Sequence, residues 1–339
     1  MEHAQLGSDA AAEDRGHSTS STDAASILES FGVRRAVVVV TPSLAKSEIL
    51  ADLIDGFAQA EVALVGVNHC PTNRDIDGIV SLGGGSIIRT ARESSFALSG
   101  ARHVAVPTTT SCVEHFGDIS APRPDAVVLD ARGIQSVPRE QFVAQAFNAM
   151  TFAIEAVCDS AASVATVALA IEAVSGLRRG LLHAISGETL DSSTAMTMLI
   201  AAARAGDTTR HSQAGVARSI GEALHDRSSL SYALCVALVL PFALAFVRRA
   251  CADRIASLAP AFELAAASDE IEAADGVIGA VRRLGLEAGL PRNFRTAGIS
   301  REAMEGTAKA VPLLPVAADF IRPATSSGQI MNELFRFAW

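Results

Sequence analysis

Lysine, tyrosine and tryptophan are nearly absent from this chain of 339 residues. It contains one Trp, one Tyr and two lysines, Lys46 and Lys309. Acidic residues outnumber basic ones by 37 to 28, which gives a formal net charge of −9 at pH 7. Binding to a nucleic acid relies on an excess of positive charge. The composition therefore argues against a nucleic-acid partner.

Cysteine is scarce, and its spacing suggests neither a disulfide framework nor a zinc site. The five cysteines are Cys70, Cys112, Cys158, Cys235 and Cys251. Because they are odd in number and scattered, we expect free thiols in a reducing compartment. The polar N-terminus also lacks the apolar segment of a secretory signal. Together these features predict a cytoplasmic protein.

One uncharged apolar run, residues 230–247, approaches the length of a membrane span. It contains Pro241, lies within an alanine-rich helical half and has no aromatic belt or basic cluster beside it. We therefore expect a buried core helix and no membrane contact.

The rest of the composition is that of a well-buried globular protein, with 49% apolar and 19% charged residues. Strand patterns at residues 34–40, 62–67, 77–82, 103–107 and 126–130 alternate with helical ones, which predicts a parallel sheet covered by helices. From residue 137 onward the patterns are all helical, beginning with a long one at 139–174. We expect a flexible tail over 1–24, a Rossmann-like α/β domain over 25–136 and an all-α domain over 137–339, with the active-site cleft between the two domains.

A glycine-rich turn connects the third expected strand to a helix. It consists of Gly83, Gly84, Gly85 and Ser86. Glycine lets a ligand approach the backbone closely, and a helix N-terminus favours an anion, so this turn can cradle a pyrophosphate. A tight turn without a ligand would have the same local pattern. Ligands of such sheets lie at the carboxyl ends of the strands, where Thr41, Thr108 and Thr109 are also expected.

The order of motifs along the chain resembles the iron-containing alcohol dehydrogenase and dehydroquinate synthase-like superfamily, and within it the maleylacetate reductase branch. The resemblance runs from about residue 25 almost to the end. The residues that carry it include Thr41-Pro42, Gly83-Gly84-Gly85-Ser86, Pro107-Thr108-Thr109, Glu114, Asn148-Ala149-Met150 and Leu240-Pro241.

This resemblance implies a dehydroquinate synthase-like fold, a homodimer and NAD(P) bound on the glycine turn. The implied cofactor-binding residues are Thr41, Gly83, Gly84, Gly85, Ser86, Arg92, Thr108 and Thr109. Arg92 stands where the family has a lysine, so a cation is kept near the cofactor.

The family also implies Fe²⁺ or Zn²⁺ held by one Asp and three His. Here the Asp position is Asn148, and the three His positions are Phe152, Arg218 and Tyr232. Phenylalanine has no ligand atom, and arginine has no acceptor lone pair. We therefore expect no metal site.

Five residues remain candidates for catalysis. Arg218 and Glu222 are four residues apart on an expected helix and share one face, although a solvent-exposed salt bridge would have the same spacing. Tyr232 is a candidate proton donor or a core hydroxyl. His115 is a candidate acid or base, or a packed histidine. Asn148 completes the set from the former ligand positions.

Three functions are compatible with these residues. The first is a metal-independent, maleylacetate-reductase-like oxidoreductase that reduces a carbonyl or an activated alkene of a small molecule with NAD(P)H. In this hypothesis Arg218 replaces the lost electrophile and Tyr232 donates the proton. The second is a non-redox cyclase, isomerase, lyase or dehydratase of secondary metabolism that uses the same cleft for acid/base catalysis. The third is a regulatory or scaffold homologue without catalytic activity.

Overall fold

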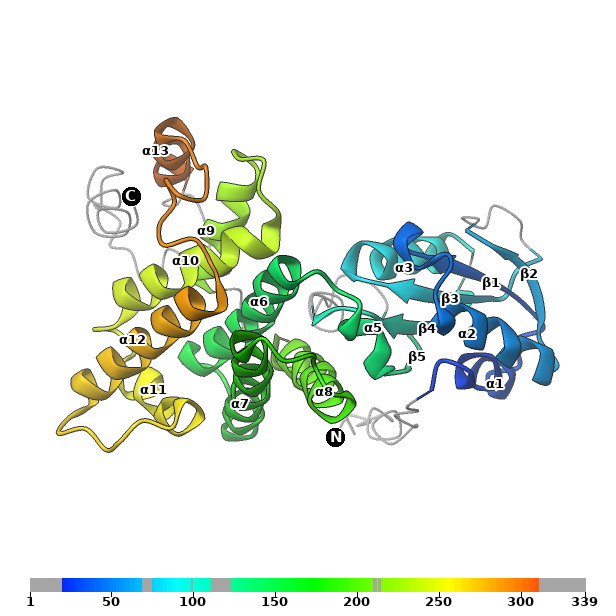
Figure 1. Cartoon of the computed structure of the whole chain (residues 1–339), viewed down its shortest axis with the longest axis horizontal. Coiled ribbons are helices and arrows are strands. Elements are labelled where there is room, and N and C mark those ends of the chain that lie inside the picture. Colours follow the sequence, from blue (N-terminus) through cyan, green and yellow to red (C-terminus); the bar gives the residue numbers. More distant parts are fainter. Residues whose placement is uncertain are drawn as a thin grey trace, which may run out of the picture.

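A computed structural model describes residues 20–68, 75–98, 100–110, 123–209, 212 and 215–310. A sheet-containing half and a helical half lie side by side, and α5 (Ala131–Gln135) leads from one to α6 (Arg139–Cys158) of the other (Figure 1). This arrangement confirms the expected fold class, with a parallel sheet followed by helices.

The sheet has the strand order β2-β1-β3-β4-β5, and each neighbouring pair is parallel. Its strands are β1 (Arg35–Val40), β2 (Ala63–Val67), β3 (Gly78–Gly83), β4 (Arg102–Pro107) and β5 (Ala126–Val127). Val38 and Val40 of β1 pack with α1 (Asp23–Ser30) and α2 (Glu48–Gln59). Val37 and Val39 point to the other face, which α3 (Gly85–Ala97) covers. Burial on both faces explains the continuous valine run.

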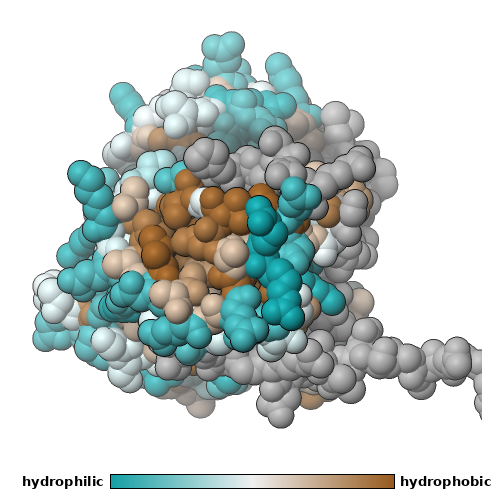
Figure 2. All heavy atoms as spheres, turned by 90° about the vertical axis from the view of Figure 1, so that its right-hand side faces the viewer, coloured by the Kyte–Doolittle hydropathy of each residue, from teal (hydrophilic) through white to brown (hydrophobic). Residues whose placement is uncertain are grey.

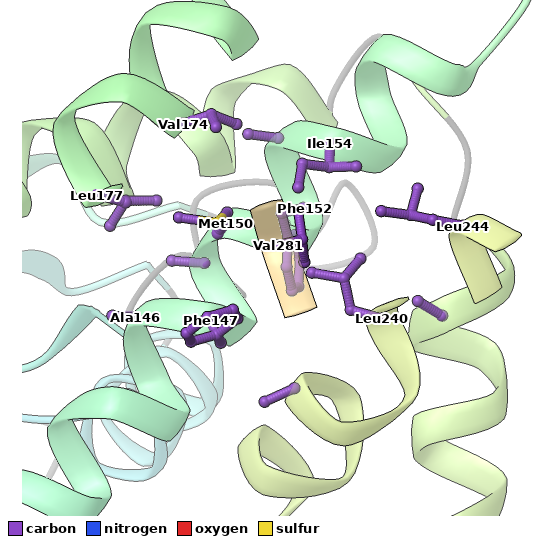
Figure 3. Close-up of a cluster of buried hydrophobic side chains, with 14 of the residues drawn as sticks. Ala146, Phe147, Met150, Phe152, Ile154, Val174, Leu177, Leu240, Leu244 and Val281 are labelled. Carbon is purple, nitrogen blue, oxygen red and sulfur yellow. The ribbon is translucent and has the colours of Figure 1, made fainter. Parts of the chain in front are cut away.

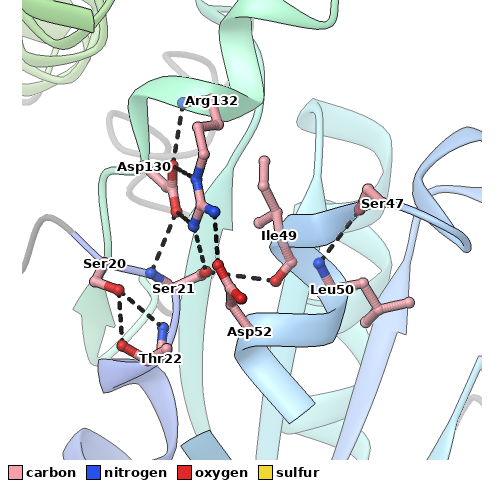
Figure 4. Close-up of polar contacts among 9 residues, drawn as sticks. All are labelled: Ser20, Ser21, Thr22, Ser47, Ile49, Leu50, Asp52, Asp130 and Arg132. Atoms are coloured by element: carbon pink, nitrogen blue, oxygen red, sulfur yellow. Dashed lines mark hydrogen bonds and ion pairs between the residues drawn. The ribbon is translucent and has the colours of Figure 1, made fainter. Parts of the chain in front are cut away.

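The segment before α1 is part of the fold, contrary to the flexible tail expected as far as residue 24. Ser21 and Ala24 are fully buried. The backbone N–H of Ser21 donates to Asp130, and its hydroxyl donates to the carbonyl of Ile49 (Figure 4). Long-range hydrogen bonds of this kind leave no periodic pattern in the sequence. Residues 1–19 lie outside the described part.

The helical half is built around α6 and α10 (Tyr232–Val247). Its other elements are α7 (Val164–Ser186), α8 (Ser192–Thr208), α9 (Val216–His225), α11 (Ala252–Ser257), η5 (Ala259–Phe262), α12 (Glu270–Ala288) and α13 (Arg301–Ala310). α10 is apolar around its whole circumference because other helices surround it, as expected for a core helix. Among the described residues, no helix is long and apolar enough to cross a membrane.

The long helix expected over residues 139–174 is in fact two helices, α6 and α7. The break coincides with polar residues that form local hydrogen bonds. Asp159 is extended, with ψ of 125°, and its carboxylate accepts from the N–H of Ala161. Ser163 then caps α7 by accepting from the N–H of Thr166. Such side-chain bonds compete with continued helix, which the apolar periodicity alone does not reveal.

The described cysteines Cys158, Cys235 and Cys251 are buried free thiols, as expected. Cys70 and Cys112 lie outside the described residues.

Candidate functional site

The glycine turn lies where the carboxyl ends of β1, β3 and β4 meet. A Cβ on Gly83 would lie 2.2 Å from the hydroxyl oxygen of Thr41, and one on Gly84 would lie 3.1 Å from that of Thr109. Glycine is therefore needed for these strand ends to approach one another. Gly84 is the N-cap of α3 and provides no side-chain cap, so the first N–H groups of the helix remain available to an anion.

The turn opens into a cleft between the two halves, with a volume of about 380 Å³. This volume is within the range of about 300–1,000 Å³ found for small-molecule sites. The sheet half contributes Thr41, Ser43, Leu44, Gly84, Gly85, Ser86, Thr108 and Thr109. Ser136, Val137 and Pro138 follow α5, and the helical half contributes Gln141, Ala144, Gln145, Ser231, Tyr232 and Ala233.

One cleft-lining residue has a buried polar atom without a hydrogen-bond partner among the described residues. The hydroxyl of Thr109 is completely shielded from solvent, although it lies beside the turn. Gln145 is 9% exposed and faces the cleft from α6. Burying an unsatisfied polar group costs roughly 1–3 kcal/mol. The uncapped start of α3 and the accessible amides and hydroxyls of the lining make the chemistry of the cleft fit a polar cofactor such as a dinucleotide.

The side of α6 that lines the cleft continues toward the former ligand positions. Gln141, Ala144 and Gln145 share one face of the helix by their spacing of three and four residues. The same spacing leads on to Asn148 and then to Phe152, so one stripe of α6 connects the cleft to these positions. Asn148 is fully buried.

At the former ligand positions an aromatic ring and a guanidinium pack against each other. The guanidinium carbon of Arg218 lies 4.2 Å from the ring centre of Phe152. Phe152 itself belongs to the core of the helical half, where Figure 3 shows it beside Val281 and Leu240. Two of the four positions are therefore in contact with each other, as a cation–π pair.

Glu155, one turn beyond Phe152, neutralises this arginine. Its carboxylate accepts from Nε of Arg218 at 2.5 Å and from the backbone N–H groups of Gly215, Ala217 and Arg218 at 2.9, 2.7 and 3.1 Å. The two side chains are only 6% and 11% exposed, respectively. Glu155 thus caps the N-terminus of α9 and holds the charge of Arg218 in an ion pair.

These residues do not fit a metal ion. The positions of two ligands are filled by a core ring and a charge-paired guanidinium, neither of which has a lone pair to donate. Within the described ranges, no three His, Cys, Asp or Glu side chains gather in a geometry that could hold a metal.

Tyr232 is the first residue of α10 and lines the cleft. The ring of His225 stands edge-on to it, with 6.3 Å between the ring centres. Nδ1 of His225 donates to the carbonyl of Leu230 at 2.7 Å, because a carbonyl can only accept. Glu222, on the preceding helix α9, is exposed.

The structure brings most of the expected cofactor residues together with Tyr232. Six of them line the cleft, namely Thr41, Gly84, Gly85, Ser86, Thr108 and Thr109. Gly83 is not in the lining but lies close to the side chain of Thr41. The lining of the cleft does not include Arg92, Asn148, Arg218 or Glu222. Arg92, a residue of α3 itself, is buried, and His115 lies outside the described residues.

The sequence interpretation missed Gln141 and Gln145. A signal was present in the sequence, because two glutamines four residues apart precede Asn148 on the same helical face. Ser43 and Ser231 were also missed, and nothing in the local pattern distinguishes these serines from ordinary turn and capping residues.

Known proteins resemble this chain in both sequence and fold. It is 26% identical over 259 residues to the probable alcohol dehydrogenase EutG of Escherichia coli, a match spanning 66% of this chain and 63% of that protein. The solved structure of a 1,3-propanediol oxidoreductase has a TM-score of 0.82 at 18% identity and covers 94% of this chain and 96% of its own. Maleylacetate reductase from Rhizobium sp. strain MTP-10005 gives 0.77 at 20% identity, covering 95% and 94%.

Residues 142–338 match the model of the C-terminal region of the Fe-containing alcohol dehydrogenase family. This match takes in α6, with Gln145, Asn148 and Phe152, and all of the later helices. Together with the shared fold, it confirms the resemblance expected from the motifs: the chain belongs to the iron-containing alcohol dehydrogenase family.

Proposed function

We propose that this protein is an NAD(P)H-dependent reductase that acts on a carbonyl or an activated alkene of a small organic molecule without a metal ion. The observation that carries the proposal is the uncapped N-terminus of α3, which opens into the same cleft as Tyr232. The relatives named above are alcohol dehydrogenases and reductases. They favour redox chemistry over the non-redox alternative.

In this proposal the residues of the chain bind and orient the reactants. The first N–H groups of α3 bind the pyrophosphate, and Thr108 and Thr109 line the part of the cleft beside them. When bound, the reduced nicotinamide would supply a hydride for the substrate carbon. Tyr232 donates its phenolic proton to the carbonyl oxygen as negative charge develops there, and water reprotonates it.

The ion pair with Glu155 changes the role proposed for Arg218. A guanidinium neutralised by a buried carboxylate polarises a distant carbonyl only weakly. We therefore propose that Arg218 fills the former ligand positions and fixes α9, while the hydrogen bond from Tyr232 polarises the substrate.

The test is a fluorescence or calorimetric titration with NADH and NADPH on two matched variants. Ser86 lies in the first turn of α3 at the cleft, where Asp would repel a pyrophosphate but favour the helix. Ser86→Asp is expected to fold normally and to lose binding. Ser193→Asp in the first turn of α8 makes the same change away from the cleft and should bind like the wild type. The absence of wild-type binding to both cofactors would exclude the redox proposal.

The metal-free part of the proposal has a separate test. Prolonged treatment with EDTA is expected to leave both cofactor-dependent reduction and melting temperature unchanged, and added Fe²⁺ or Zn²⁺ should raise neither. Loss of reduction on chelation, with recovery on adding one of these ions, would contradict it.

A further inference from the structure

Gln145 makes no hydrogen bond among the described residues, although it is almost buried. It lies on the cleft-lining face of α6 and is 9% exposed. Its amide atoms are not among the fully shielded polar atoms, so a group that enters the cleft can reach them. We therefore look for the ligand group that best complements this amide.

The amide of Gln145 is both a donor and an acceptor. Its best complement is therefore a group with the same two functions, which is a carboxamide. A carboxylate can accept from the NH₂ group but offers no proton to the amide oxygen, and a ketone has the same limitation.

The electrostatics of the cleft also favour an uncharged group. Among the described residues that line it, there is no Asp, Glu, Lys, Arg or His. The N-terminus of α3 is the element that attracts an anion, and it belongs to the sheet half. On the side of the helical half, Gln145 is accompanied by Gln141, Ala144, Ala233 and Tyr232. The end of a ligand that reaches this side is therefore neutral.

We propose that Gln145 binds the carboxamide of the nicotinamide ring. Its oxygen accepts from the carboxamide NH₂, and its own NH₂ donates to the carboxamide oxygen. Gln145 is thus a positioning residue that fixes the rotation of the ring across the cleft from the glycine turn. This inference rests on the proposed function, because it requires that a nicotinamide cofactor enter the cleft.

The test compares the affinities for NADH and for reduced 3-acetylpyridine adenine dinucleotide, in which a methyl group replaces the carboxamide NH₂. Only binding is measured, so no substrate is needed. The wild type should prefer NADH by roughly 3- to 10-fold, which corresponds to one neutral hydrogen bond. Gln145→Leu should reduce this preference to near unity. Gln59→Leu at the exposed end of α2 is the control and should keep the wild-type ratio.

Gln145→Glu is a second variant, and it should change the preference for NADH in the opposite direction. Its carboxylate still accepts from the carboxamide NH₂ but repels the carbonyl of the acetyl analogue, so the preference for NADH should rise above that of the wild type. If neither variant changes the ratio while NADH still binds, the inference is wrong and the proposed function stands. If the wild type binds neither NADH nor NADPH, both are wrong.

Discussion

Arg218 shows how a former ligand position can become structural. Its guanidinium packs against the ring of Phe152 and forms an ion pair with Glu155. The three N–H groups that Glu155 also binds belong to the start of α9. A single buried carboxylate therefore satisfies both the helix terminus and the arginine. Removing the arginine would leave the buried carboxylate with its backbone donors alone.

Replacing Arg218 should consequently destabilise the fold. We expect Arg218→Ala to lower the free energy of unfolding by about 3 kcal/mol, since breaking a buried ion pair costs roughly 3–5 kcal/mol and Glu155 keeps its backbone donors. Urea denaturation provides the measurement. The matched control is Arg204→Ala, which breaks the exposed pair between Arg204 and Glu172 and should cost at most about 1 kcal/mol. Equal effects of the two substitutions would argue against a structural role for Arg218.

Tyr232 supports a prediction about activity. A panel of small aldehydes, ketones and enones identifies what the wild type reduces, and Tyr232→Phe is then tested on the same compound. Loss of a general acid lowers turnover by about 10²- to 10⁴-fold. Affinity for NADH should change little, because Phe keeps the ring that packs against His225. Unchanged turnover would assign the proton transfer to another group.

At the scale of elements, close helix contacts explain why some glycines are needed and others are not. α9 crosses α10 at Gly221, where a Cβ would lie 2.9 Å from the Cα and 3.0 Å from the backbone nitrogen of Val236. On α12, a Cβ at Gly276 would have ordinary contact, at 3.5 Å, with the side chain of Leu264. Since backbone cannot yield as a flexible side chain does, the two positions should respond in opposite ways to alanine.

We therefore expect Gly221→Ala to destabilise the protein by about 1–3 kcal/mol through overpacking. Gly276→Ala should stabilise it by about 0.5–1 kcal/mol, because alanine is the better helix former. Both values can be obtained from urea midpoints under identical conditions. A stabilising effect at Gly221 would show that the α9–α10 contact is looser than described.

A polar cluster joins α5 and α2 to the segment before α1 (Figure 4). Arg132 contacts Asp130 at 2.7 Å and Asp52 at 2.6 Å. Burial alone would raise the pKa of Asp130, but the hydrogen bonds and positive charge of Arg132 outweigh it, and the net effect is a lowered pKa. Since the folded pKa lies below the unfolded one, the cluster stabilises the protein above the unfolded pKa of about 3.9.

This stabilisation is lost as the pH falls through the folded pKa of Asp130. The wild type should therefore lose free energy of unfolding steeply below about pH 4. Asp130→Asn should be less stable than the wild type at pH 7 and should show a shallower decline in acid. Urea midpoints between pH 7 and pH 3 provide the curve, with Asp55→Asn on the exposed side of α2 as the control. Parallel curves for the wild type and Asp130→Asn would rule out this linkage.

For the whole molecule, the sequence predicted those features that depend on neighbouring residues. The valine run of β1, the glycine turn and the apolar α10 are all local patterns, and each was found where expected. The pairing of Arg218 with Glu155 spans 63 positions, and Gln145 lines the same cleft as the glycine turn although they belong to different halves. Tertiary contacts of this kind have no periodic signal, so the roles of these two residues required the structure.

The outer edge of the sheet indicates how two copies could associate. β2 is the edge strand, and its sequence, Ala-Leu-Val-Gly-Val, contains no charge or proline to discourage pairing. Figure 2 shows apolar side chains gathered on this end of the molecule. Val65 of β2 and Ile54 of α2 are 44% and 36% exposed. Antiparallel pairing of this edge with its own copy about a two-fold axis would cover the patch and satisfy both edges.

We expect a homodimer in solution that depends on this edge. Val65→Asp would place two carboxylates near the two-fold axis and remove apolar area from both copies, so the dimer should dissociate at micromolar concentrations. Light scattering during size-exclusion chromatography measures the mass directly. Val164→Asp is the matched control, because Val164 is 88% exposed in the first turn of α7, where an acid is favourable. That variant should remain dimeric, and a Val65→Asp protein that stays dimeric would place the interface on another face.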